Sequence, residues 1–93
     1  MNCKRKGSKN ERRSMKLLES SGYTCTKAAA SLGLFDIIGI SATDFVAVQV
    51  KSNEWPRELE MENLRAFRCP PNCKKILHRW RDRQQKPDVK EID

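Results

Sequence analysis

The stretch from residue 35 to residue 52, FDIIGISATDFVAVQVKS, constrains the fold of this chain more than any other. Residues 35–40 and 45–50 are each of strand length and are rich in β-branched and aromatic side chains. Residues 41–44 form a polar break of the kind that makes a turn. The stretch therefore predicts two adjacent strands joined by a tight hairpin.

Three polar residues, Asp36, Gln49 and Lys51, lie inside this apolar hairpin. With a two-residue loop at Thr43-Asp44, or a four-residue loop over residues 42–45, Asp36 lies opposite Lys51 and Gln49 is its diagonal neighbour. Side chains alternate along a strand, so all three share one face of the sheet. A slip of one residue would move Asp36 to the opposite face. The sequence therefore predicts a carboxylate, an amide and an ammonium together on a largely apolar surface.

Such a cluster needs a physical reason, because burying a charge is costly unless it is paired or binds a metal. One explanation is a buried ion pair between Asp36 and Lys51, with Gln49 hydrogen-bonded beside it. The other is a divalent-metal site in which Asp36 and the carbonyl oxygen of Gln49 are hard oxygen ligands and Lys51 lies near a reacting phosphate. The spacing alone leaves both explanations open.

An Asp followed, after twelve residues, by Gln-Val-Lys at the end of the next strand resembles the PD-(D/E)XK nuclease motif. Within that superfamily the chain is most similar to the archaeal-type Holliday-junction resolvases. The similarity covers residues 4 to about 52 and rests on short matches in order along the chain, which are Arg5-Lys6-Gly7, Glu11, Gly22-Tyr23, Ala30-Ser31, Phe35-Asp36 and Val48–Ser52.

The resemblance implies a catalytic set of Glu11, Asp36, Gln49 and Lys51. In this set Asp36, Gln49 and the backbone carbonyl of Val50 bind the metal, Lys51 orients or polarises the attacking water, and Glu11 is an additional acid from the first helix. The implied cofactor is Mg²⁺, for which Mn²⁺ can substitute. The resolvases usually have a glutamate where this chain has Gln49, so one negative ligand is lost. A Gln-x-Lys form is familiar from modification-dependent restriction nucleases, which keeps activity open.

The net charge of +7 over 93 residues is placed mainly near the two ends of the chain. Residues 1–16 contain seven Lys or Arg and one acid, and residues 74–86 contain six and one. This distribution favours a polyanionic partner, with nucleic acid first, although a merely solvated basic surface would look the same. The candidate DNA-binding residues are Lys4, Arg5, Lys6, Lys9, Arg12, Ser31, Arg79 and Arg81.

Neither a membrane-spanning run nor a secretory leader is visible in the sequence, and we expect a cytoplasmic protein. The four cysteines, Cys3, Cys25, Cys69 and Cys73, are then expected to be reduced. Cys69 and Cys73 could form half of a zinc site, but there is no second closely spaced pair. We therefore expect the cysteines to bind no metal.

The rest of the chain predicts two helices and three more strands. Residues 1–7 are expected to be a flexible basic arm, followed by a helix that Ser8 caps, with Glu11 in the capping box, and that Gly22 ends. A second helix should begin at Pro56, with Glu58, Glu60 and Glu62 in its N-terminal half, and end before Pro70. Its apolar stripe has Met61, Leu64 and Phe67, widened by Leu59 and Ala66. The three further strands are expected at residues 23–27, 75–81 and 89–92.

These elements predict one α/β domain of the restriction-endonuclease-like class, with a small mixed sheet of four to five strands flanked by two helices. A helix between residues 52 and 75 would make the flanking strands parallel. Trp55 could be part of the core, a dimer contact or a base-stacking platform. His78, the one histidine, is expected to be a strand residue beside Trp80.

The function predicted on this basis is a Mg²⁺-dependent, structure-selective DNA endonuclease similar to Holliday-junction resolvases. The expected partners are branched or duplex DNA and a second copy of the chain, with neither a membrane nor a small-molecule substrate. An alternative from a different class is a non-catalytic DNA-binding or assembly module that keeps the nuclease fold, which Gln49 favours. A nickase or restriction subunit acting on modified or mismatched DNA is a third possibility.

Overall fold

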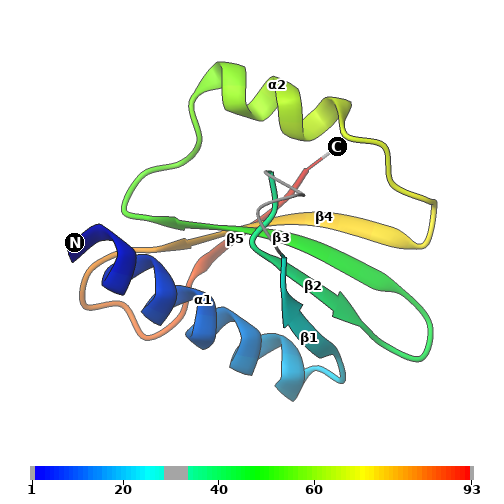
Figure 1. Ribbon diagram of the computed structural model, residues 1–93, viewed down its shortest axis with the longest axis horizontal. Helices are drawn as coiled ribbons and strands as arrows, with labels where there is room; N and C mark the ends of the chain where they lie inside the picture. Colours follow the sequence, from blue (N-terminus) through cyan, green and yellow to red (C-terminus); the bar gives the residue numbers. More distant parts are fainter. Residues whose placement is uncertain (1, 29–33, 93) are drawn as a thin grey trace.

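The computed structural model describes residues 2–28 and 34–92, with side chains from residue 9 onward, and contains one mixed five-stranded sheet (Figure 1). The elements in chain order are α1 (Asn2–Ser20), β1 (Thr24–Lys27), β2 (Ile37–Ile40), β3 (Phe45–Ser52), α2 (Glu58–Ala66), β4 (Cys73–Trp80) and β5 (Asp88–Ile92). The strands lie side by side in the order β1-β2-β3-β4-β5. β3 and β4 are parallel and the other pairs are antiparallel. The predicted fold class is confirmed, and so is the parallel crossover through α2.

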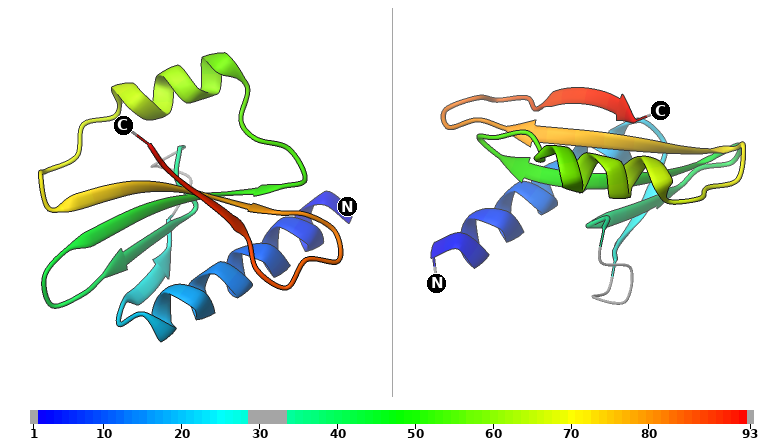
Figure 2. Two further views of the ribbon diagram at one scale, coloured as in Figure 1. Left: turned by 180° about the vertical axis from the view of Figure 1, so that it is seen from behind. Right: turned by 90° about the horizontal axis from the view of Figure 1, so that it is seen from above.

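The two helices cover opposite faces of the sheet, as Figure 1 and the view from behind in Figure 2 show. Alternation along β3 separates two apolar clusters. Val46 and Val48 pack with Ile37 and with Leu18 of α1, whereas Ala47 packs on the other face in a cluster that contains Leu64 of α2. Because β3 is buried on both faces, the strand is apolar almost throughout, and its polar residues are exceptional.

The hairpin between β2 and β3 has a different register from the one predicted. Ile40 pairs with Phe45 and Ile37 with Val48, which shifts the pairing by two residues from the predicted one. The ladder ends at Ile37, and the Asp36 N–H donates to the carbonyl of Val48, the partner of Ile37, so Asp36 is not opposite Lys51. The strands are connected by residues 41–44, where the Ser41 N–H donates to the Asp44 carbonyl at 2.9 Å and the Asp44 N–H donates to Ser41 Oγ at 3.0 Å. The predicted register was wrong by two residues, which leaves the paired side chains of β2 and β3 on their predicted faces.

Helix α1 begins at Asn2, so the expectation of a helix start capped by Ser8 was wrong, and residues 2–7 are part of the helix. The flexibility predicted for residues 1–7 stays a prediction. Lys and Arg are good helix formers, and residues 4–6 can extend the helix in spite of the following Gly7. The helix ends as expected, with Gly22 at a positive φ of 97°.

Polar contacts also attach α1 to the sheet. Asn10 Nδ2 donates to Ser52 Oγ at 2.8 Å, at the C-terminal end of β3. One turn later, the fully buried hydroxyl of Ser14 lies 2.9 Å from His78 Nδ1 and accepts a hydrogen bond from Trp80 Nε1 at 2.7 Å. Both partners are on β4, so α1 is held across two strands.

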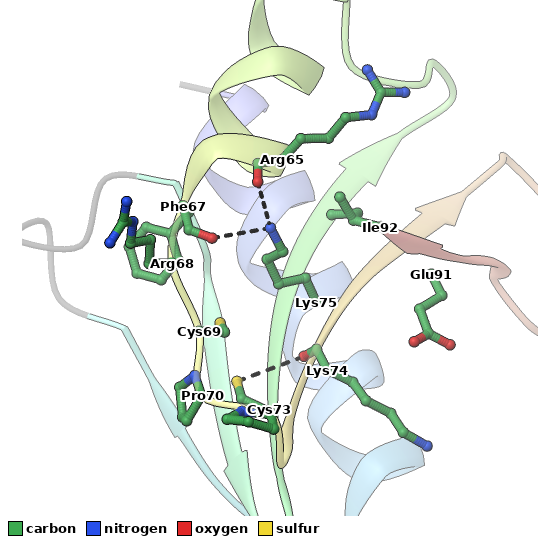
Figure 3. A pocket seen from close by; sticks show the side chains of 11 residues that line it. Arg65, Phe67, Arg68, Cys69, Pro70, Cys73, Lys74, Lys75, Glu91 and Ile92 are labelled. Atoms are coloured by element: carbon green, nitrogen blue, oxygen red, sulfur yellow. Dashed lines mark hydrogen bonds between the residues drawn. The ribbon is translucent and has the colours of Figure 1, made fainter.

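Helix α2 begins at Glu58, two residues after the predicted start at Pro56. Leu64 is fully buried and Met61 and Phe67 pack beside it, but Leu59 is 71% exposed and does not belong to the apolar stripe. The C-terminal end of α2 is fixed by Lys75, whose buried ammonium donates to the carbonyls of Leu64, Arg65 and Phe67 at 2.7–3.0 Å. Figure 3 shows the contacts with Arg65 and Phe67. A cation at this position also suits the negative end of the helix dipole.

The remaining strands lie close to their predicted ranges, and β5 forms an edge of the sheet as expected. Among the helices that the structure describes, none combines the length and the apolar character needed to cross a membrane.

Candidate active site

Gln49 and Lys51 project from the C-terminal half of β3 toward the same residue of α2. Gln49 Nε2 donates to Glu60 Oε2 at 3.0 Å, and Lys51 Nζ lies 3.0 Å from the same oxygen. These contacts confirm that Gln49 and Lys51 share a face of the sheet. Glu60 is thus a third member of the cluster.

The Gln49 side chain is 7% exposed, and its carbonyl oxygen, Oε1, is buried without a hydrogen-bond partner among the described residues. A buried acceptor without a partner costs about 1–3 kcal/mol. The amide donor of the same side chain is satisfied by Glu60. The oxygen is therefore held in a position where a further group, such as a cation, would stabilise it.

Asp36 lies just before β2 and contacts the backbone of β3 on either side of Gln49. Its backbone N–H still donates to the Val48 carbonyl at 2.8 Å, and its Oδ2 accepts the Val50 N–H at 2.7 Å. The carboxylate thereby takes the place of a strand partner for Val50, where the β2 ladder has stopped. This backbone contact fixes one carboxylate oxygen of Asp36 beside β3.

Burial raises the pKa of the Asp36 carboxyl, whereas the Val50 N–H and the charge of Lys51 lower it and the charge of Glu60 raises it. Lys51 therefore acts on Asp36 electrostatically, but its ion pair in this structure is with Glu60. The explanation of the cluster as a simple Asp36–Lys51 ion pair does not describe this arrangement.

Glu11 approaches the cluster from α1, on the other side of the sheet. Its Oε1 is 3.9 Å from Lys27 Nζ at the end of β1. Burial raises the pKa of Glu11, the charge of Asp36 raises it further, and Lys27 lowers it. Asp36 is thus close enough to interact electrostatically with Glu11 of α1 and with Glu60 of α2. The structure brings Glu11, Asp36, Gln49 and Lys51 to one end of the sheet.

The chemistry of these donors suits a hard divalent cation. In the part of the chain that the structure describes, no three His, Cys, Asp or Glu residues gather closely enough to form a metal site by themselves. The available set is the Asp36 and Glu11 carboxylates together with the unpartnered amide oxygen of Gln49. Oxygen donors of these kinds are those that Mg²⁺ prefers. The fit therefore depends on Gln49 as well as on the acids.

The predicted DNA-binding residues differ in their exposure and in their contacts. Lys9 and Arg12 are exposed on α1. Arg79 and Arg81 both contact Asp88 Oδ2, at 2.7 and 3.2 Å, and the Arg79 guanidinium lies over the Trp55 ring at 4.4 Å. Residues 4–6 belong to α1, but their side chains lie outside the described part of the structure, and so does Ser31.

Trp55 and His78 are both accounted for within the fold. Trp55 packs against the cluster around Leu64. His78 is buried against Ser14, and burial lowers its pKa to about 4. Cys25, Cys69 and Cys73 are free thiols, and Cys69 and Cys73 line a pocket at the end of α2 together with Lys74 and Glu91 (Figure 3). The absence of zinc remains a prediction.

Sequence reasoning missed Glu60, which it treated only as an acid favourable to the helix dipole. A signal was present, because Glu60 precedes the buried Leu64 by four residues and therefore lies on the same face of α2. The buried polar residues Asn10 and Ser14 were also missed. They lie four residues apart on the face of α1 that packs on the sheet.

The comparisons with known proteins concern the family and the fold of the chain. The sequence model of the archaeal Holliday junction resolvase family matches residues 2–66, which include Glu11, Asp36, Gln49, Lys51 and Glu60. Among solved structures, the chain is similar to the 1.6 Å structure of Archaeoglobus fulgidus Hjc, a Holliday junction resolvase from an archaeal hyperthermophile. The TM-score is 0.74 at 21% sequence identity, over 94% of this chain and 73% of that one, which shows a common fold. No curated protein sequence gives a significant match.

Proposed function

Because the chain belongs to the archaeal Holliday junction resolvase family, a family of structure-selective nucleases, we propose that it hydrolyses phosphodiester bonds in branched DNA with Mg²⁺ as cofactor. The observation that carries the metal-dependent part of this proposal is the buried oxygen of Gln49, which has no partner among the described residues and lies on the strand beside Asp36. A cation would satisfy this oxygen and the nearby carboxylates together.

In this proposal Asp36, the Gln49 amide oxygen and the Val50 carbonyl hold the cation, and Glu11 contributes a further carboxylate. When bound, Mg²⁺ would polarise the scissile phosphate and lower the pKa of a nearby water. Asp36 is suited to the role of ligand because the Val50 N–H orients its carboxylate. Mn²⁺, which accepts similar oxygen donors, should support the same reaction.

Lys51 is assigned to the phosphate and the attacking water. Its ammonium is held at the cluster by Glu60 and is one-third exposed, so it is both positioned and accessible to a substrate. A fixed positive charge at this point would stabilise negative charge that develops on the phosphate and would help to position the nucleophile.

The basic residues of α1, together with Arg81, would hold the DNA backbone without regard to base sequence. Lys9 and Arg12 are exposed near Glu11, and Arg81 is half exposed beside Asp88. Arg79 is less accessible, with a side chain 20% exposed that contacts Asp88 and Trp55. It would act on DNA mainly by adding positive potential next to Lys51, its neighbour across the β3–β4 pair.

We further propose that the protein acts as a homodimer. One chain offers a single cluster of this kind, whereas resolving a junction requires cuts in two strands, and a two-fold dimer presents two sites with related polarity. The exposed Leu59 on α2 and Val89 on the edge strand β5 are apolar side chains available for such a contact.

The alternative is a non-catalytic DNA-binding module that keeps the fold. It is favoured by the neutral Gln49 and by the lack of three closely gathered acidic, His or Cys ligands among the described residues. The two functions differ in what Mg²⁺ does. An enzyme requires Mg²⁺ for cleavage, whereas a module that only binds DNA does not require it for binding.

A cleavage panel tests the proposal. Four-way junction, flap, nicked, single-stranded and linear duplex DNA are incubated with the protein in Mg²⁺, Mn²⁺ or EDTA. We expect junction cleavage with either metal and none in EDTA. Asp36→Asn keeps an acceptor for the Val50 N–H and should abolish cleavage while leaving junction binding intact, and Lys51→Ala should also be inactive.

Glu62→Gln is the matched control, because Glu62 is an exposed acid of α2 and its loss changes the net charge by the same amount as Asp36→Asn. Cleavage by Asp36→Asn and Lys51→Ala at the rate of this control would contradict the assignment of the site. A parent protein that binds junctions but cuts nothing in either metal would support the non-catalytic module.

A further inference from the structure

One carboxylate oxygen of Glu60 makes two charge-assisted contacts. Glu60 Oε2 accepts from Gln49 Nε2 at 3.0 Å and lies 3.0 Å from Lys51 Nζ. Gln49 and Lys51 are the two residues of β3 to which the proposed function assigns the cation and the phosphate. No other acid in the described part of the chain contacts both.

We propose that Glu60 is a positioning residue of the nuclease site: it turns the Gln49 amide so that its oxygen is free to bind the cation, and it fixes the Lys51 ammonium at its own carboxylate. The inference rests on the proposed function. It also goes beyond it, because it assigns a role to a residue of α2 outside the strand motif.

The orientation of the Gln49 amide follows from the chemistry of its neighbour. An ionised carboxylate only accepts hydrogen bonds, so the side of the amide that faces Glu60 must be the NH₂ group. The oxygen is then turned away from Glu60, and in the structure it is buried with no partner among the described residues. A carboxylate at position 49 would present an oxygen in either orientation. A glutamine works as an oxygen ligand only if a neighbour selects one orientation.

Glu60 also supplies a negative charge close to residue 49, where the glutamine side chain is uncharged. Lys51 is paired with this charge, so it is neutralised without engaging Asp36 directly. Asp36 then remains available as an anionic ligand, and among the described residues its carboxylate is hydrogen-bonded through one oxygen to the Val50 N–H. In this arrangement Glu60 supplies the negative charge and Gln49 supplies the oxygen ligand.

The position of Glu60 is fixed by the packing of α2 rather than by its own side chain. Leu64, one turn later on the same face, is fully buried, and Lys75 binds the carbonyls at the end of the helix. The Glu60 side chain itself is about one-third exposed. A surface ion pair of this exposure usually contributes little to stability. Stability therefore gives little reason for the contact, whereas orientation of the ligand does.

The test measures cation binding to the DNA-free protein. Mn²⁺ binding is followed by electron paramagnetic resonance for the parent and four variants: Glu60→Gln, the exchange variant Gln49→Glu/Glu60→Gln, Glu62→Gln and Asp36→Asn. A glutamine at position 60 can present either its oxygen or its NH₂ to Gln49, so it no longer selects the orientation. We expect Glu60→Gln to weaken Mn²⁺ binding by about tenfold, the lower end of the effect of lost outer-shell partners.

The exchange variant restores the donor–acceptor pair with the roles reversed and has the charge of the parent. We expect it to recover Mn²⁺ binding to the level of the parent or better. Glu62→Gln changes the net charge as Glu60→Gln does, but on the exposed side of α2, and should bind Mn²⁺ like the parent. Thermal melting of each variant shows that the fold is intact, and recovery in the exchange variant separates a loss of orientation from a loss of structure.

Three results overturn the inference, and each can be distinguished from the others. If Asp36→Asn abolishes Mn²⁺ binding but Glu60→Gln binds as the parent does, the cation site stands and the role of Glu60 is refuted. The role of Glu60 is also refuted if the exchange variant binds no better than Glu60→Gln. If Asp36→Asn binds Mn²⁺ as tightly as the parent, there is no cation site at this cluster, and the proposed function is refuted as well.

Discussion

Acidification should destabilise this protein through His78. The side chain is 3% exposed, and burial lowers its pKa from the ordinary value of 6.5 to about 4. Ser14 Oγ accepts from Trp80 Nε1, and its own hydrogen can be donated to Nδ1 of a neutral His78 that carries its proton on Nε2. Protonating Nδ1 would remove this acceptor and place a positive charge in a buried site. The folded protein therefore favours neutral His78.

The size of the effect follows from the difference between the two pKa values. Between about pH 6.5 and pH 4 the unfolded chain binds a proton at this residue and the folded chain does not, so stability falls as the pH falls. Each unit of difference is worth about 1.4 kcal/mol, which gives about 3 kcal/mol over the whole interval and about 2 kcal/mol by pH 5. This stability is fully present above about pH 7.

The assay is urea unfolding at about pH 7.5 and about pH 5 for the parent and for His78→Gln. Glutamine can still accept the Ser14 hydroxyl but does not titrate. We expect the parent to lose about 2 kcal/mol more than the variant across this interval. The raised pKa values of Glu11 and Asp36 act in the opposite direction in both proteins, because the folded state takes up protons there first, and they cancel in the comparison.

Two results would refute the reasoning. One is an identical loss of stability in the parent and in His78→Gln. The other is an NMR titration in which His78 of the folded protein titrates near 6.5.

Three further predictions concern the site and its support. Gln49→Glu places a carboxylate against Glu60, so it should lower the melting temperature of the metal-free protein but reduce the Mg²⁺ concentration needed for half-maximal cleavage. Unchanged values of both would contradict the contact between residues 49 and 60 at 3.0 Å. Lys75→Met leaves three carbonyls at the end of α2 without their donor and should cost roughly 3 kcal/mol of unfolding free energy in urea, whereas Lys74→Met, at an exposed position, should cost little. Sedimentation at micromolar concentration should give the mass of a dimer, and a monomer both alone and on a four-way junction would contradict the two-fold arrangement proposed here.

The sequence was sufficient to predict the strands, the fold class and the face on which the functional side chains lie. Alternation in β3 places Gln49 and Lys51 together whatever the neighbouring strand does, because it is a property of one extended chain. The predicted pairing with β2 was wrong by two residues, yet both side chains remained on the predicted face. The position of Asp36 beside Val48 and Val50 required the structure, because the turn is closed by the side chain of Ser41, and several loop lengths were compatible with the same residues.

The tertiary structure alone decided which distant residues complete the site. Glu60 meets Gln49 because the turn of α2 that carries it lies over the end of β3, and Ser14 meets His78 because α1 crosses β4. Spacing along each element showed which face Glu60 and Ser14 occupy, but it could not show what lies opposite that face. The angle and offset at which each helix packs on the sheet are set by the fit of many apolar side chains from both surfaces, and no local pattern in the sequence contains that information.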